Sequence, residues 1–245
     1  MTQSSKTAFV AGLVGGIVAL AGAFGAVRLG WAPLAPGPAI HDYLLAHPEV
    51  LAEASSRLQA QQDASADTER QAAVNKLGLR AFFDPRLAFV TGPANAKTTI
   101  VEFFDYNCPY CRASIPAVKT FYNEHKNARF AFIEFPIKGV QSTLAARAAV
   151  AARLQPDKYL AFHFALMGEE NILDENLVYA DAQKVGLNVE KLKSDMKSPE
   201  VALSLTASHN LAEAVNIDGT PAFIIDGKIR EGVLDAGELK RMTGE

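Results

Sequence analysis

The sequence predicts an α/β domain with a central sheet covered by helices, which follows a helical segment and an apolar N-terminal run. Between residues 85 and 245, strand-like and helix-like patterns alternate: strand, strand, helix, strand, a long helical block, then a β-hairpin and a last helix. The runs at 98–104 and 130–137 are almost continuously apolar. Such runs are typical of strands that are covered on both faces.

Composition excludes several classes of protein. The chain has 245 residues, of which 49% are hydrophobic and 21% charged, and its formal net charge is −3. This balance is that of an ordinary globular chain and excludes a disordered or fibrous one. With no excess of basic residues, no nucleic-acid partner is expected.

Residues 1–30 contain an uncharged apolar run from Ala8 to Val27, which as a helix would rise about 30 Å. Lys6 before the run and small-residue triplets within it fit a signal peptide. The length of the run and Arg28 after it fit a retained membrane anchor, and a buried globular helix is the third alternative. Both leading interpretations predict export to the periplasm, either tethered to the inner membrane or released after cleavage.

Residues 31–39 are rich in Pro and Gly and predict a semi-rigid linker. Residues 40–84 predict helices, and Pro48 suits the first turn of the second one. The stretch 59–70 has almost nothing apolar to bury, so this helix cannot form a core by itself. Two interpretations stay open: a solvated stalk, or an oligomerisation helix that would make residues 40–79 the basis of a homo-oligomer.

Residues 85–245 form the predicted domain. Runs of β-branched and aromatic residues mark its strands, at 87–90, 98–104, 130–137, 220–225 and 228–233. Helical spacing and cap residues mark its helices, at 111–125, across an insertion of about 140–217, and at 235–242. Asp226-Gly227 predicts the turn of the hairpin.

The two cysteines, Cys108 and Cys111, lie three positions apart where a helix begins. The free N–H groups and partial positive charge of a helix start favour a thiolate. We therefore expect Cys108, at the exposed helix end, to be the attacking nucleophile with a lowered pKa, and Cys111 to resolve the mixed disulfide. Pro109 stiffens the pair, and Tyr110 adds no charge, so the activation is expected to be moderate.

Metal binding is the alternative use of two thiols. Structural zinc would need a second ligand pair, and the five histidines are never three to five residues apart. A Cu(I) site made by the two thiolates is chemically allowed, and gives the alternative function of a copper-handling protein. The leading interpretation needs no metal and no cofactor beyond a reversible Cys108–Cys111 disulfide.

Two other sites in the sequence bear on the chemistry. Glu102 stands on the predicted central strand. Buried beneath the dithiol, it would have a raised pKa and could relay a proton to or from Cys111; alternatively it points out of a less buried strand. Thr220-Pro221 begins a strand and offers backbone groups to an extended substrate segment. From the residues alone a trans bond before Pro221 is expected, because only about 5–6% of the peptide bonds before proline in folded proteins are cis.

The segment VEFFDYNCPYC at 101–111, together with GTPAFIIDG at 219–227, resembles the DsbA-like thiol–disulfide oxidoreductases. Within them it is most similar to the branch that contains ScsC and the Com1-type exported proteins. The resemblance covers 85–245 and extends to the N-terminal helices. It implies a thioredoxin fold with an inserted helical domain and a cis bond before Pro221. It also implies family roles for Cys108, Cys111, Glu102 and Thr220, whereas Tyr110 departs from the His of the strong oxidases.

We therefore expect an exported thiol–disulfide oxidoreductase or isomerase that forms or shuffles disulfides in cysteine-containing exported proteins, with a membrane redox partner. Substrate contacts are expected at Pro109, Tyr110, Thr220 and Pro221. In ScsC-like relatives an N-terminal helical segment makes the protein oligomeric, in association with isomerase activity, and residues 40–79 would do so here. Whether such a protein oxidises or shuffles disulfides follows from its redox poise.

Overall fold

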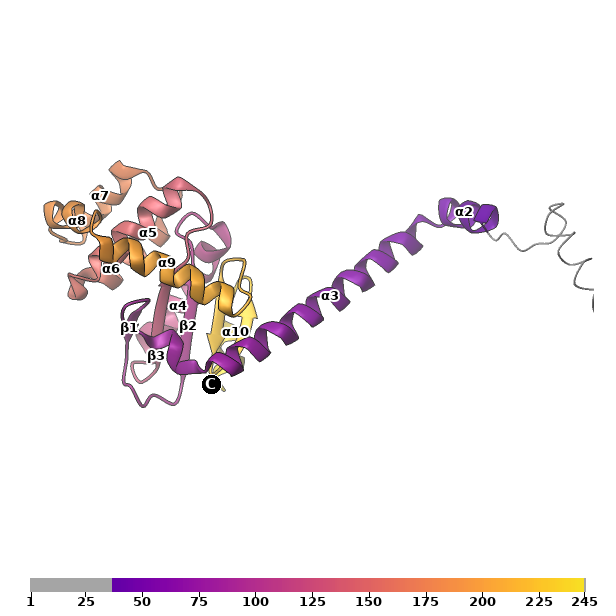
Figure 1. Cartoon of the computed structure of the whole chain (residues 1–245), viewed down its shortest axis with the longest axis horizontal. Coiled ribbons are helices and arrows are strands. Elements are labelled where there is room, and N and C mark those ends of the chain that lie inside the picture. The colour runs from indigo at the N-terminus through magenta and orange to yellow at the C-terminus, as the bar shows by residue number, and fades with distance from the viewer. Residues whose placement is uncertain (1–36, 245) are drawn as a thin grey trace, which may run out of the picture. The chain divides into compact units, whose positions relative to one another are not determined.

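The computed structural model describes residues 37–244 (Figure 1). The chain divides into two compact units, Met1–Asp63 and Ala64–Glu245. The signal peptide or membrane anchor predicted for residues 1–30 lies outside the described residues. Within 37–244, no helix is both long and apolar enough to cross a membrane.

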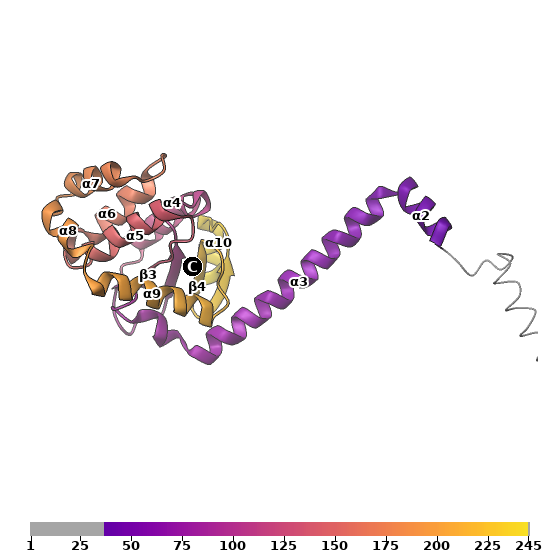
Figure 2. The same cartoon turned by 45° about the horizontal axis from the view of Figure 1, so that its top comes forward.

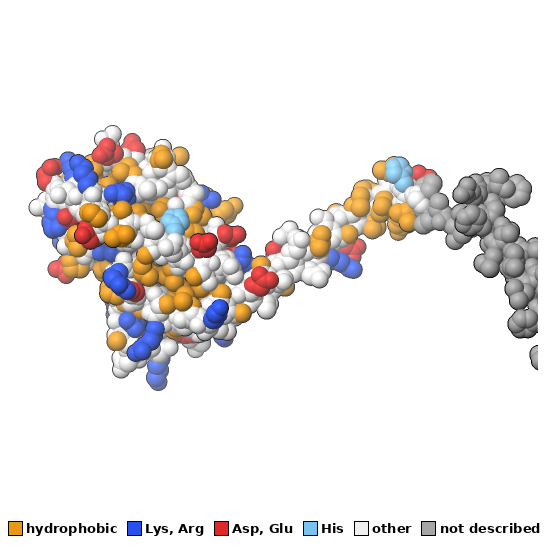
Figure 3. Space-filling model, viewed as in Figure 1, with side chains coloured by type: hydrophobic (Ala, Val, Ile, Leu, Met, Phe, Trp, Pro, Cys, Tyr) orange, Lys and Arg blue, Asp and Glu red, His pale blue; other side chains and the backbone are white. Residues whose placement is uncertain are grey.

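From residue 37 on, two α-helices precede the sheet, α2 (Gly37–Ala46) and α3 (Pro48–Leu77). Helix α2 begins inside the stretch predicted as a linker, so residues 37–39 are helical, whereas α3 begins at Pro48 as expected. Figure 3 shows hydrophobic side chains along these helices. The large exposed ones are Ile40, Tyr43, Leu45, Leu51, Leu58 and Leu77. A short 3₁₀ helix, η1 (Leu79–Phe83), follows and buries two phenylalanines.

The five strands form one sheet in the order β1-β3-β2-β4-β5. Their bounds are β1 (Phe89–Thr91), β2 (Thr99–Phe104), β3 (Arg129–Glu134), β4 (Ala222–Ile225) and β5 (Lys228–Glu231). Strands β2 and β3 are parallel, and the other neighbouring pairs are antiparallel. All of β4 is buried, as is every residue of β2 and β3 after the first, which explains their nearly continuous apolarity.

Helix α4 connects β2 to β3, and five helices between β3 and β4 form the insertion. The bounds are α4 (Pro109–Glu124), α5 (Val140–Ala152), α6 (Pro156–Gly168), α7 (Glu175–Lys184), α8 (Val189–Asp195), α9 (Pro199–Ala214) and α10 (Ala236–Thr243). Helices α5 to α8 gather together beside the strands (Figure 2). The N-caps of α7, α8 and α9 are Asp174, Asn188 and Ser198, and each accepts a hydrogen bond from a backbone N–H of the first turn.

Several predicted boundaries differ from the structure because side chains or turns take the backbone groups. Strand β3 ends at Glu134 rather than at residue 137, since the N–H groups of Ile137 and Lys138 donate to the Asp105 carboxylate. The first strand begins at Phe89 rather than at 87, because the N–H of Leu87 closes a turn onto the Asp84 carbonyl.

The sheet separates two hydrophobic clusters. Side chains alternate along β2, so that Ile100 and Phe104 join the cluster that contains both cysteines. Val101 and Phe103 join the other cluster, with the phenylalanines of η1. Glu102 has the same parity as Ile100 and Phe104, which places it on the face that packs against the cysteine-bearing helix.

A buried carboxylate attaches the helical insertion to the sheet. Glu134, at the end of β3, forms an ion pair with Arg153 and accepts a hydrogen bond from the Tyr159 hydroxyl at 2.7 Å. Its backbone carbonyl accepts a hydrogen bond from the Ser208 hydroxyl, also at 2.7 Å. These partners follow α5 or lie in α6 and α9, so one residue links three parts of the insertion to β3. Buried ion pairs require such additional hydrogen bonds to offset desolvation.

Candidate active site

The two cysteines lie at the start of α4, where β2 leads into the helix. Cys108 is the N-cap residue, with extended backbone angles, and Pro109 occupies the first helical turn. Cys111 lies one turn inside, so the predicted placement of the pair at a helix start is confirmed. Proline fits here because the first helical N–H groups have no partner within the helix.

The sulfur of Cys108 is not exposed. The residue has 0% relative exposure, so the expectation of an exposed thiol is wrong for the dithiol form. Its Sγ lies 3.2 Å from the carbonyl oxygen of Thr220. Attack on a substrate sulfur therefore requires a local movement of the atoms that cover it.

The two thiols have opposite electrostatic environments. A hydrogen bond from the Cys111 thiol is the largest cause that lowers the pKa of Cys108 to about 5. Burial opposes this shift, whereas Thr220 and the backbone N–H groups of Tyr110 and Cys111 support it. Desolvation raises the pKa of Cys111 well above its usual value. One thiol is therefore ionised at neutral pH and the other keeps its proton.

Glu102 is buried, with 1% exposure, so the alternative in which it points out of a less buried strand is wrong. Neither of its carboxylate oxygens has a hydrogen-bond partner among the described residues. Desolvation raises the pKa of Glu102 to about 8. A negative charge on Glu102 would raise the pKa of Cys111 further, so the two groups interact electrostatically.

The peptide bond between Thr220 and Pro221 is cis, as the family resemblance implied. This turn immediately precedes β4, and it places the Thr220 carbonyl beside Cys108, 112 positions earlier in the chain. The Pro221 carbonyl accepts a hydrogen bond from the N–H of Gly232 at 2.9 Å. The Thr220 hydroxyl oxygen is buried and has no partner among the residues described.

A polar network under the dithiol was missed by the sequence analysis. The Asp105 carboxylate accepts hydrogen bonds from the backbone N–H groups of Asn107, Ile137 and Lys138, and from the Ser142 hydroxyl. An aspartate between a strand and a helix often bonds the backbone two residues on, which was the available signal. The network ties the loop before Cys108 to the loop before α5.

Arg112 extends this network to the loop after α6. Its guanidinium donates to the carbonyls of Tyr106, Glu170 and Asn171. The side-chain oxygen of Asn107 also accepts a hydrogen bond from the N–H of Leu173 at 2.9 Å. The segments on both sides of the cysteine loop are thus held by charge-assisted or buried hydrogen bonds.

His163 is fully buried and its Nδ1 lies 3.1 Å from the Tyr106 hydroxyl. Desolvation lowers the pKa of His163 to about 3, so the ring is neutral. It packs against the rings of Phe104 and Phe132. His163 therefore packs as a neutral ring within the hydrophobic cluster beside the sheet.

In the part of the chain that the structure describes, no cluster of three or more His, Cys, Asp or Glu residues could hold a metal ion. The two thiols are the soft ligands that the copper alternative would use. The thiols already interact with each other and with Thr220.

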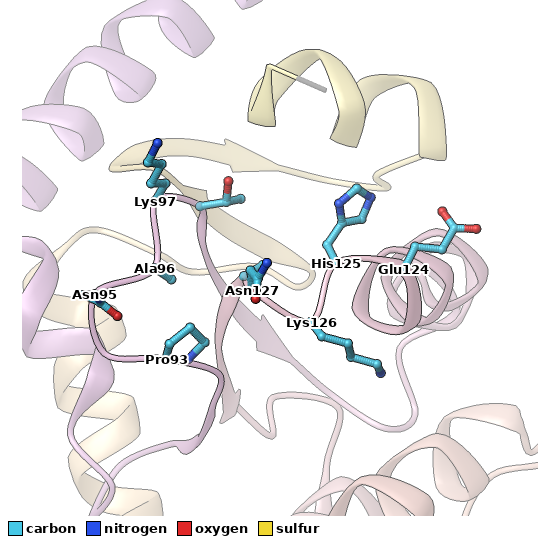
Figure 4. Close-up of a pocket in the computed structure, with 10 residues that line it drawn as sticks. Pro93, Asn95, Ala96, Lys97, Glu124, His125, Lys126 and Asn127 are labelled. Carbon is cyan, nitrogen blue, oxygen red and sulfur yellow. The ribbon is translucent and has the colours of Figure 1, made fainter.

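A cavity of about 690 Å³ lies at the other end of β2 from the cysteines (Figure 4). It is lined by the loop at 93–98 and by the end of α4 with the residues that follow, 124–128. Helix α4 has 16 residues and therefore spans about 24 Å. The cavity and the dithiol therefore lie at opposite ends of α4.

Two models of known protein families match this chain. The model of the DSBA-like thioredoxin domain matches residues 99–243, a range that contains both cysteines and the cis-proline turn. The model of the copper resistance protein ScsC N-terminal domain matches residues 37–64. The chain belongs to the DsbA-like thiol–disulfide oxidoreductase family and is close to ScsC.

Solved structures agree with this assignment. A thioredoxin-like oxidoreductase from Silicibacter pomeroyi is 40% identical, with a TM-score of 0.63, and the match covers 68% of this chain and 96% of that one. The catalytic domain of Proteus mirabilis ScsC is 25% identical, with a TM-score of 0.64, covering 71% of this chain and 96% of that one. The fold is therefore thioredoxin-like with added helices, as predicted.

Curated relatives match over similar regions. Disulfide bond formation protein D of Bacillus subtilis is 26% identical over 162 residues, which cover 62% of this chain and 73% of that protein. Other matches are Na⁺/H⁺ antiporters, such as one of Salinispora arenicola that is 27% identical over 151 residues. The chain spans about a quarter of the length of these antiporters, since the match covers 23% of that relative.

Proposed function

We propose that this protein is an exported oxidoreductase or isomerase that forms or shuffles disulfides in cysteine-containing proteins through its Cys-Pro-Tyr-Cys centre. The observation that carries the proposal is the asymmetry of the two thiols. The pKa of Cys108 is lowered to about 5, and that of Cys111 is raised. A thiolate is the nucleophile in disulfide exchange, so Cys108 attacks first.

Each exchange conserves atoms and electrons. The Cys108 thiolate attacks a substrate disulfide, forms a mixed disulfide and releases one substrate thiolate. Cys111 then loses its proton and attacks the sulfur of Cys108. The Cys108–Cys111 disulfide forms and the second substrate thiolate leaves, so the substrate is reduced by two electrons and the protein is oxidised. The reverse sequence oxidises the substrate.

Glu102 is proposed to handle the proton of Cys111. With a pKa of about 8, Glu102 is mostly protonated at pH 7. When the protein oxidises a substrate, this proton is available to the Cys111 sulfur as that sulfur leaves the internal disulfide. When the protein reduces a substrate, the ionised carboxylate accepts the proton instead.

The proposed substrate contacts surround Cys108. They are made by Pro109, Tyr110, Thr220 and Pro221. Tyr110 is 61% exposed at the start of α4 and offers an apolar ring to a substrate. Backbone groups beside the cis-proline turn are proposed to pair with an extended substrate segment, whose arrival uncovers the Cys108 sulfur. We further propose periplasmic action with a membrane redox partner.

The proposed function predicts an acidic thiol. Thiolate absorbance at 240 nm of the reduced protein, followed from pH 3 to pH 9, is expected to rise with a midpoint near pH 5, because the pKa of Cys108 is about 5. The Cys108→Ser variant is the control and should lack this transition. A midpoint near the ordinary value of 9.0 would overturn the proposal.

We also propose that residues 40–79 form an oligomerisation segment. The match of 37–64 to the ScsC N-terminal domain and the exposed apolar side chains of α2 and α3 support this. An exposed apolar row is stabilised by pairing with another helix. Several active sites in one assembly would raise the effective concentration of thiols around a misfolded client.

The oligomer is tested by replacing two exposed leucines. Leu51→Ser combined with Leu58→Ser is expected to reduce the mass measured by light scattering to that of one chain. Exchange with a small dithiol should stay within about twofold of the original protein, whereas repair of a scrambled protein falls. Gln62→Ser, an exposed polar change on the same helix, is the matched control. A mass of one chain for the unmodified protein would contradict the proposal.

A further inference from the structure

Arg70 is largely buried although most of α3 is exposed. Only 14% of its side chain is accessible. Its Nε donates to the carbonyl oxygen of Asn216 at 3.0 Å. Its Nη2 lies 3.3 Å from a carboxylate oxygen of Glu231 and 3.7 Å from one of Asp218. Arg70 thus bonds three points that are far from it in the sequence.

These three points flank the cis-proline turn. Asn216 and Asp218 belong to the segment that enters the turn at Thr220. Glu231 pairs with Ala222, the first residue of β4 after the turn. The next residue, Gly232, donates its N–H to the Pro221 carbonyl. A single guanidinium therefore holds the chain on both sides of Thr220-Pro221.

Gln71 fixes the same part of α3 to the β4–β5 hairpin. Its amide nitrogen donates to the carbonyl of Gly227 at 2.8 Å, and its amide oxygen accepts from the N–H of Ile229 at 3.1 Å. The side-chain amide of Gln71 thus both donates to and accepts from the backbone of the hairpin, as the backbone of a neighbouring strand would. Val74, one turn further on, is buried with 2% exposure. Figures 1 and 2 both show this end of α3 beside the hairpin.

The turn that Arg70 holds contacts the reactive sulfur. In the thiol form, Cys108 Sγ donates to the Thr220 carbonyl. When Cys108 ionises, that donor is lost, and the buried Thr220 hydroxyl, which has no other partner within residues 37–244, becomes available to donate to the thiolate. Thr220 lowers the pKa of Cys108, as expected for such a donor. A small displacement of the turn would prevent the hydrogen bond from the Thr220 hydroxyl to the thiolate, since hydrogen bonds weaken steeply with distance and angle.

We infer that Arg70 is a positioning residue for disulfide exchange: its guanidinium holds the Thr220-Pro221 turn against Cys108, while Gln71 anchors α3 to the adjoining hairpin. The inference rests on the proposed function in taking Cys108 as the reactive thiol. An ordinary surface ion pair would have no such effect, because it would contact neither the carbonyl of Asn216 nor both flanks of the turn.

The test measures how the rate of alkylation of Cys108 by iodoacetamide depends on pH in the full chain. Arg70→Met is expected to raise the pKa of Cys108 by about one unit, because the thiolate loses its donor. The thiolate fraction at pH 5 then falls about fivefold, while the rate at pH 7.5 changes little. Arg70→Lys keeps the positive charge, but its ammonium group cannot contact the three partners at once as the planar guanidinium does. We expect it to raise the pKa of Cys108 by about half as much as Arg70→Met.

The matched control is Arg57→Met on the same helix. Arg57 is 80% exposed and pairs with Glu53 one turn away, so its replacement should leave the profile unchanged. If Arg70→Met does not fold, the same pH profile is measured for Arg70→Lys and Glu231→Gln. Folded Arg70 variants with the profile of the original protein would overturn the inference while the proposed function stands. An ordinary thiol pKa in the original protein would instead overturn the proposed function.

Discussion

Replacing Cys108 by serine is expected to reduce disulfide exchange by about 10³-fold or more, the scale on which loss of a catalytic nucleophile acts. A hydroxyl in this position stays protonated, whereas the pKa of the Cys108 thiol is about 5. The measurement is the rate of insulin reduction by dithiothreitol in the presence of catalytic amounts of each variant. Circular dichroism of the variant should match that of the original protein.

Cys111→Ser is the informative counterpart. The serine hydroxyl can donate to Cys108 in place of the Cys111 thiol, so Cys108 still ionises and the first attack still occurs, but nothing releases the substrate. We therefore expect mixed disulfides between Cys108 and client proteins to accumulate, visible as higher-mass bands on non-reducing gels. The opposite pattern, with trapped complexes in Cys108→Ser and none in Cys111→Ser, would reverse the assigned roles.

The second large effect is on stability, and comes from the buried carboxyl of Glu102. Its pKa is about 8 in the folded protein, against an ordinary value of 4.5. Between these values the folded state keeps a proton that the unfolded state has released. The free energy of unfolding therefore falls as the pH rises from 4.5 to 8, and the contribution is fully present only below pH 4.5.

The expected size follows from the pKa difference. From pH 5 to pH 7.5 the contribution of Glu102 falls by about 3 kcal/mol, at 1.36 kcal/mol per pH unit. Glu102→Gln removes this titration, so the difference in stability between variant and original protein should change by that amount over the same range. The measurement is urea denaturation at each pH, with the Cys108–Cys111 disulfide formed so that neither thiol titrates.

The matched control is Glu213→Gln, which changes an exposed glutamate on α9. Its stability should follow that of the original protein at every pH. If Glu102→Gln also follows the original protein across pH 5 to 7.5, the carboxyl of Glu102 is ionised in the fold, and its proposed exchange of a proton with Cys111 is wrong. The same comparison applies to the rate at which Cys111 resolves mixed disulfides.

The order of the elements could be predicted from the sequence because each depends on neighbouring residues. Apolar runs mark β2 and β3, and caps such as Asp174 and Ser198 mark helix starts through bonds to N–H groups three residues on. Cys108 and Pro109 mark the start of α4 in the same local way. The ionisation of Cys108 also follows largely from near neighbours, since its pKa is lowered first by the Cys111 thiol and further by the N–H groups of the helix start.

How deeply the site residues are buried could not be predicted in this way. The pattern of β2 assigns Glu102 to a face, but its 1% exposure depends on what packs on that face. Cys108 was expected to be exposed and has 0% exposure, because the Thr220-Pro221 turn arrives from 112 positions further along the chain. Burial of a side chain is the sum of contacts with segments distant in sequence.

By itself, then, the sequence determined the succession of strands and helices, the redox pair at a helix start and, through family resemblance, the cis bond at Pro221. The tertiary structure decided which groups share a site: Thr220 with Cys108, Asp105 with Ser142, and Arg70 with both flanks of the turn. The physical reason is that these two groups of properties depend on interactions over different separations along the chain. Periodicity, capping and the hydrogen bond between the two cysteines act within a few residues, whereas burial and the raised pKa values of Cys111 and Glu102 arise where distant segments exclude water together.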